Sequence, residues 1–96
     1  MAVEQKGNLE AFDCVLRGRE LWYTHTKERN TQARELLLRA SELDPGFAAA
    51  WGWLATAHIN DYVSQWTASP SHSLELGLAA AAHATRVIRP GWSAVH

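Results

Sequence analysis

The sequence has one cysteine, three prolines and no excess of basic residues, and each scarcity excludes a class of protein. A single cysteine cannot form an internal disulfide, so Cys14 fits a reducing compartment and is expected to be a small buried apolar residue. Nine Lys plus Arg stand against ten Asp plus Glu, which gives a net charge of -1. Without positive charge to neutralise phosphates, we expect neither nucleic acid nor a membrane surface as partner.

Long apolar runs are also missing. The first eight residues are polar and lack the apolar segment of a signal peptide. The longest nearly charge-free stretch, residues 46–60, is shorter than the roughly 20 residues that a membrane-spanning helix needs. The sequence therefore predicts a cytoplasmic protein.

What the chain does contain is apolar content sufficient for one small folded domain. It has 96 residues, of which 47% are hydrophobic and 20% are charged, and five are tryptophans. That composition excludes a disordered chain. So many large rings need a packed interior or a partner surface to cover them, and we expect a single domain over residues 1–96.

The first half of the chain predicts two amphipathic helices. Apolar residues at helical spacing indicate a helix over 9–23 with Asn8 as its N-cap, and a second over about 33–43. Residues 24–31 have no aliphatic side chain and are expected to form a connection. Asp44-Pro45-Gly46 should end the second helix, because a residue before proline avoids helical geometry.

The second half predicts two less polar helices. Residues 47–61 are mostly alanine and large apolar residues, so this helix must be covered on most sides. After a connection over 62–69, Ser69-Pro70 predicts the start of a helix that runs to about Ile88, where Arg89-Pro90-Gly91 should stop it. Residues 91–96 then look like an incomplete fifth helix. No segment alternates as a strand does, so the fold class is all-α.

Two segments of the chain repeat each other at a distance of 45 residues. They are Leu43-Asp-Pro-Gly-Phe-Ala-Ala-Ala and Ile88-Arg-Pro-Gly-Trp-Ser-Ala-Val. Each joins the end of one helix to an aromatic start of the next. This repetition predicts an antiparallel helix-hairpin array, with one hairpin over about 8–44, a second over about 46–89 and the incomplete helix after them.

The spacing within these helices resembles the tetratricopeptide repeat. Trp51-x2-Leu54-Ala55-x2-His58 resembles its first helix, and Ala33-x3-Leu37-x2-Ala40-x4-Pro45 resembles its second helix and terminal proline. The resemblance implies that these residues pack within the array. The sequence departs from the pattern at Ala55 and His58, and Thr85 stands where the second repeat would have alanine if aligned on Pro90. The repeat length exceeds the usual 34 residues by 11, and we place this insertion in residues 62–71.

Three longer runs make a more specific resemblance. Residues 8–18, 39–47 and 66–74 are similar to the tetratricopeptide region found C-terminal to bacterial class III adenylate or guanylate cyclase domains. They are also similar to repeat regions attached to some bacterial winged-helix regulators. The resemblance implies a non-catalytic protein-interaction module of a bacterial signalling protein, with no cofactor. The cyclase domain and its metal-binding aspartates have no counterpart in this chain.

The repeat resemblance also implies which residues face a binding groove. They lie on the inner face of the third helix: Ala49, Gly52, Thr56, Ile59 and Asn60. An alternative is that they only contact the first hairpin. The partner would be a protein or a peptide.

Candidates for metal binding and catalysis are weak. His58 and Asp61 could share a helix face and His72 could approach them, yet no His-x3-His or Cys-x2-Cys pair suggests zinc. The acid pairs Glu10 with Asp13 and Glu42 with Asp44 fit solvated helix faces better than general acid and base. We expect no metal site and no enzyme activity.

The distribution of charge leaves two further hypotheses open. Residues 1–45 hold fifteen of the nineteen charged side chains, so the second half is short of polar surface. The chain could therefore be a truncated structural fragment that self-associates through residues 74–96. Alternatively, the region of Trp51, Trp53 and Trp66 could bind a small ligand.

Overall fold

The computed structural model describes the backbone of residues 2–95 and the side chains of residues 9–87. Its helices in chain order are α1 (Ala2–Tyr23), α2 (Lys27–Leu43), α3 (Ala48–Val63) and α4 (Pro70–Val95), and the backbone over this range forms no strand. The expected all-α class is confirmed.

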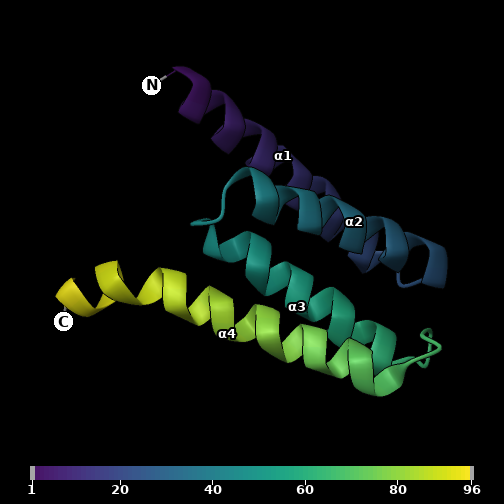
Figure 1. Cartoon of the computed structure of the whole chain (residues 1–96). Helices are drawn as coiled ribbons and strands as arrows, with labels where there is room; N and C mark the ends of the chain where they lie inside the picture. Colours follow the sequence, from purple (N-terminus) through teal and green to yellow (C-terminus); the bar gives the residue numbers. More distant parts are fainter. Residues whose placement is uncertain (1, 96) are drawn as a thin grey trace.

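Helices that follow one another in the chain also lie side by side (Figure 1). We call α1 with α2 hairpin 1, and α3 with α4 hairpin 2. The helix α3 contacts all three others, whereas α4 packs against α3 alone. One side of hairpin 2 is therefore covered by hairpin 1, and no described helix covers the other side.

The helix α2 starts earlier than the sequence predicts. The expected connection over 24–31 is wrong for residues 27–31, which are helical. The reason is that Thr26 acts as N-cap, with its side-chain oxygen accepting from the backbone N–H of Arg29 at 3.1 Å. The predicted stop at Asp44 is confirmed, and the Asp44 N–H still donates to the Ala40 carbonyl.

Two other predicted boundaries are wrong. The helix α1 begins at Ala2, so Asn8 lies inside it rather than at its N-cap. The helix α4 continues through Pro90 to Val95, so Arg89-Pro90-Gly91 does not stop it and no separate helix begins at residue 91. A proline within a helix removes one backbone hydrogen bond and bends the helix, and this does not always end it.

Both hairpins turn on a residue in the left-handed region. His25 follows α1 with φ of 54°, and Gln65 follows α3 with φ of 59°. The left-handed conformation is unfavourable for residues with a Cβ. The His25 ring lies 5.1 Å from the Trp66 ring, centroid to centroid, so the two turns contact each other.

The core is built from small residues, which lets the helices approach closely. A Cβ on Gly18 would lie 2.9 Å from Leu37 Cγ and 3.4 Å from the Ala33 carbonyl oxygen. Of the residues assigned to repeat packing, five are buried, Trp51 is half-buried and Pro45 is exposed in the turn; the buried ones are Ala33, Leu37, Ala40, Leu54 and Ala55. Cys14 is buried, as expected.

Candidate functional site

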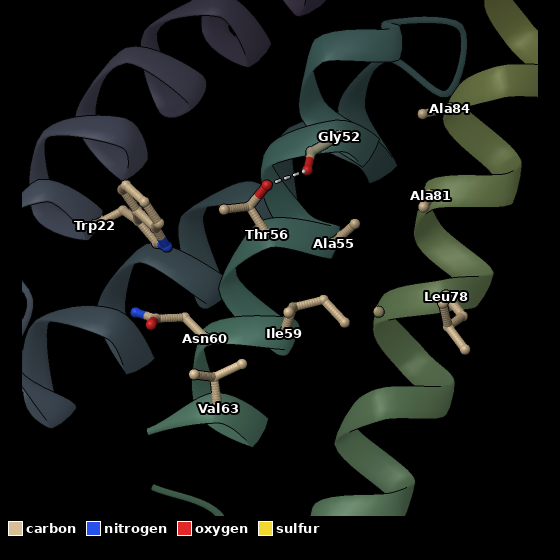
Figure 2. A pocket seen from close by; sticks show the side chains of 11 residues that line it. Trp22, Gly52, Ala55, Thr56, Ile59, Asn60, Val63, Leu78, Ala81 and Ala84 are labelled. Carbon is tan, nitrogen blue, oxygen red and sulfur yellow. Dashed lines mark hydrogen bonds between the residues drawn. The ribbon is translucent and has the colours of Figure 1, made fainter. Parts of the chain in front are cut away.

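An apolar groove runs between α3 and α4, and Trp22 of α1 borders it (Figure 2). Its volume is about 560 Å³ and none of its lining side chains is charged. The lining comes from α1, α3 and α4: Trp22, Gly52, Ala55, Thr56, Ile59, Asn60, Val63, Gly77, Leu78, Ala81 and Ala84. Val63 is 68% exposed and Leu78 is 59% exposed, so large apolar side chains face solvent along the groove.

Helical periodicity creates this groove. Gly52, Thr56 and Ile59 follow one another at a spacing of three to four residues, which places them on one face of α3. The opposite face of α3 carries Ala50, Leu54 and Ala57, which are buried in the core. The helix α3 therefore shows one apolar face to hairpin 1 and another to the groove.

The floor of the groove depends on a close approach of α4 to α3. A Cβ on Gly77 would lie 2.7 Å from Ile59 Cδ1 and 3.3 Å from the Ala55 carbonyl oxygen. Thr56 donates its hydroxyl hydrogen to the Gly52 carbonyl at 3.0 Å, so this polar group is satisfied within α3. The groove thus presents mainly hydrocarbon surface.

Trp22 borders the groove from hairpin 1. Its ring packs edge-on against Trp53, with the centroids 5.5 Å apart. Its Nε1 is buried and has no hydrogen-bond partner among the described residues. Leaving a buried donor unpaired costs roughly 1–3 kcal/mol, so an acceptor that reached this nitrogen would be favoured.

A second hollow adjoins the groove. It measures about 480 Å³ and lies between α1 and α3, where Tyr23, Ala49 and Trp53 line it. Trp22, Gly52 and Thr56 line both hollows. The structure thus places four of the five candidate groove residues, Gly52, Thr56, Ile59 and Asn60, along the groove and Ala49 along the adjoining hollow.

A buried polar network joins the two hairpins beside the groove. Asn30 Nδ2 donates to the Ala57 carbonyl at 3.0 Å and to Asp61 Oδ1 at 2.7 Å, and Arg34 Nη1 donates to Asp61 Oδ2 at 2.5 Å. Asn60 Nδ2 donates to Asn30 Oδ1 at 3.2 Å. Asn30 is 1% exposed and Asp61 is 5% exposed. Buried polar groups of this kind must be paired, so the network determines how α3 sits on α2.

The sequence did not reveal this network. Asn30 was expected in a connection, and Asp61 was considered only as a metal ligand beside His58. The available signal was a charged residue in an otherwise apolar helix, since Asp61 is the single charged side chain of α3. A charge in such a helix indicates a buried partner.

His58 and Asp61 line a small polar hollow together with His72, as the sequence suggested. Among the described residues, no three His, Cys, Asp or Glu side chains are grouped to hold a metal ion. Burial lowers the pKa of His58 below its usual 6.5, and the Arg34 charge lowers it further, while Asp61 opposes the shift and His72 adds to it. His58 is therefore neutral at pH 7.

Three of the four acids in the two pairs occupy solvated helix faces. Asp13 Oδ2 lies 3.7 Å from Arg17 Nη1, and Glu10 Oε2 lies 3.2 Å from Arg39 Nη2, with all four side chains about half exposed or more. Glu42 is exposed and Asp44 is half-buried in the turn after α2. Exposed ion pairs of this kind contribute little to stability.

His83 packs against Trp51 at the end of the α3 and α4 pair. The two ring centroids lie 4.0 Å apart, and Trp51 Nε1 donates to the Pro45 carbonyl at 2.9 Å. Trp51 and Trp53 face different neighbours, and Trp66 contacts His25. None of the hollows described between residues 9 and 87 is lined by all three tryptophans that the sequence suggests for a small ligand.

No helix in the described part of the chain combines the length and the apolar character that crossing a membrane requires. No protein-family model matches the chain. No solved structure matches it either. It is similar to a protein of Rhizobium meliloti (strain 1021) named putative adenylate cyclase 3, with 34% identity over 80 residues. That match covers 79% of this chain and 14% of the relative, so this helical chain is similar to a small part of a protein with a cyclase name.

Proposed function

We propose that this chain is a non-catalytic protein-interaction module of a cyclase-like bacterial signalling protein, built as a tetratricopeptide-type array. The observation that carries the proposal is the uncharged groove between α3 and α4, with Leu78 and Val63 largely exposed along it. Large apolar side chains that are exposed together along an uncharged groove favour a protein-interaction site. The similarity to a protein with a cyclase name supports a signalling context, and a cytoplasmic location belongs to the same proposal.

The repeat-type packing has support from the contacts of the small residues. Gly18 meets Ala33 in hairpin 1, and Gly77 meets Ala55 in hairpin 2, so each hairpin closes on a pair of small residues. A stacked helix-hairpin array requires that the helices of each hairpin cross in an equivalent way and that the next helix contacts both of them. The two hairpins cross at equivalent small residues, and α3 contacts both helices of hairpin 1.

The contact at Gly77 also changes the register of the two repeats. Gly77 lies opposite Ala55 as Ala33 lies opposite Gly18, so Gly77 corresponds to Ala33. The same offset makes Ala84 the equivalent of Ala40. The alignment on Pro90, which placed Thr85 there, is therefore one residue out of register because α4 continues through that proline.

A peptide-array measurement tests the proposed function. The purified chain is probed against an array of random peptides, and the Thr56→Arg variant is probed in parallel. Arginine at position 56 would put a long charged side chain into the groove, so we expect at least a tenfold loss of signal on the peptides that bind the unmodified chain.

Thr85→Arg is the matched control. Thr85 donates its hydroxyl hydrogen to the Ala81 carbonyl at 3.1 Å, as Thr56 does to Gly52, but Thr85 is exposed and does not line the groove. It should leave the signal unchanged. Peptide binding that survives Thr56→Arg would contradict the groove as the binding site.

A further inference from the structure

The open groove of hairpin 2 corresponds to the surface of hairpin 1 on which α3 packs. In both hairpins a glycine faces the backbone of a small residue on the other helix: Gly18 faces Ala33, and Gly77 faces Ala55. A Cβ on Gly18 would lie 3.4 Å from the Ala33 carbonyl oxygen, and one on Gly77 would lie 3.3 Å from that of Ala55. These two contacts are the reference points on which we align hairpin 2 with hairpin 1.

Once these pairs are matched, each residue of hairpin 1 that holds α3 has an equivalent in hairpin 2. Trp22, Asn30 and Arg34 correspond to Ile59, Leu74 and Leu78. In hairpin 1, each of the three residues contacts α3. Trp22 packs on Trp53, Asn30 donates to the Ala57 carbonyl, and Arg34 pairs with Asp61. In hairpin 2, Ile59 and Leu78 line the open groove. The groove is therefore the counterpart of a surface that already holds a helix.

We infer that the groove binds one α-helix of a partner protein, seated on hairpin 2 as α3 is seated on hairpin 1. This inference rests on the proposed function and specifies its ligand. The space is suited to a helix because Ala81 stands where hairpin 1 has Leu37, so hairpin 2 has less side-chain volume at the centre of the surface.

The partner helix must differ from α3 at one position. On hairpin 1, α3 presents Asp61 to Asn30 and Arg34. The equivalent positions on hairpin 2 are Leu74 and Leu78, which have no polar group to pair with a carboxylate. Burying an unpaired carboxylate is strongly unfavourable. The groove therefore selects a helix with an aliphatic residue where α3 carries Asp61.

A second copy of this chain does not supply such a helix in a head-to-tail arrangement. The face of α1 that corresponds to the buried face of α3 carries Asp13, Arg17 and Glu20 in place of Ala50, Leu54 and Ala57. Asp13 and Arg17 are both more than 60% exposed and pair with each other. Placing this face in an uncharged groove would bury unpaired charge, so the occupant is a different, amphipathic helix.

Two peptides test the inference on the full chain. One copies residues 48–63 of this sequence, with aspartate at the position of Asp61, and the other has leucine there. Each carries a fluorescent label, and binding is measured by anisotropy. We expect the leucine peptide to bind at least tenfold more tightly than the aspartate peptide.

Variants of α4 locate the binding. Ala81→Arg places a charged side chain in the groove, and we expect it to weaken the leucine peptide at least tenfold. Ala82→Arg is the matched control, because Ala82 is also exposed on α4 but does not line the groove. Leu78→Arg gives hairpin 2 the guanidinium that hairpin 1 has at Arg34. We therefore expect this variant to bind the aspartate peptide more tightly than the leucine peptide.

Four outcomes would overturn the inference. They are equal binding of both peptides, loss of binding in Ala82→Arg, no reversal in Leu78→Arg, and a concentration-dependent dimer in sedimentation that Ala81→Arg abolishes. The dimer would make a second copy the occupant.

If array peptides bind in a Thr56-dependent way while neither helix peptide binds, the helical ligand is wrong and the proposed function stands. If no array peptide depends on Thr56, the proposed function itself fails.

Discussion

Hairpin 1 and hairpin 2 use the same type of helix crossing but carry different side chains at equivalent positions beside it. Hairpin 1 holds α3 through Asn30 and Arg34, which pair with the buried Asp61. Hairpin 2 has leucines at both equivalent positions, and its surface is open along α4. The difference means that the same backbone packing presents polar side chains in hairpin 1 and leucines in hairpin 2.

The largest effect should come from breaking the polar contact of hairpin 1. Asp61→Ala removes the acceptor of Arg34 and leaves Asn30 with the Ala57 carbonyl alone, and removing one member of a buried pair costs about 3 kcal/mol. We expect a loss of about that size in the free energy of unfolding, measured by urea denaturation. Asp13→Ala removes an exposed ion pair and should change stability by less than about 0.5 kcal/mol. Equal effects of the two variants would contradict the special role of Asp61.

The two glycines of the crossings should respond differently to the same substitution. Gly18→Ala brings a Cβ within 2.9 Å of Leu37 Cγ, and Leu37 is fully buried. We expect a loss of about 1–2 kcal/mol, since overpacking a filled core is unfavourable. Gly77→Ala meets the end of the Ile59 side chain, which can rotate into the groove.

Gly77→Ala should therefore cost less than Gly18→Ala, because its tightest contact is with the end of a side chain, while the gain of about 1 kcal/mol in helix propensity is the same at both positions. Thermal unfolding followed by circular dichroism compares the two variants. A larger loss in Gly77→Ala than in Gly18→Ala would mean that the groove is not open.

The turns of the two hairpins provide a smaller test. Gln65 adopts a left-handed conformation and is exposed, so Gln65→Gly should stabilise the protein by about 0.5–1 kcal/mol. His25→Gly relieves the same conformation but removes the ring that packs on Trp66, so its net effect should be near zero. Melting temperatures of both variants measure the difference. A greater gain from His25→Gly would show that the contact between the turns contributes nothing.

The smallest effect should be the pH dependence that His58 adds. Its pKa in the folded protein is lowered, so the unfolded chain binds more protons as the pH falls below about 6.5. The stability contributed by the neutral ring is present above that pH and is lost toward pH 5. His58→Gln should therefore flatten the dependence of the unfolding free energy on pH between 7 and 5. An unchanged slope in His58→Gln would contradict this origin.

The fold class could be predicted from the sequence because helical periodicity and the turn at Asp44-Pro45-Gly46 are local signals. The predicted helix ends at Asn8, at residues 27–31 and at Pro90 were wrong. Where a helix begins or ends depends on which backbone hydrogen bonds form there, and the residue pattern does not determine this. The groove residues on α3 could be proposed only from the repeat resemblance. Their α4 neighbours could not be proposed, because the one-residue register of α4 depends on Gly77 packing against Ile59.

The sequence by itself determined that the chain forms helices, that the second half is poor in charge and that small residues recur where helices cross. Only the tertiary structure decided which charge is buried and which apolar face is open. Periodicity places Asp61 and Thr56 on faces of α3 but does not say which face meets hairpin 1. That choice depends on the pairing of Asn30 with Asp61 across two helices, which is a contact between residues far apart in the chain.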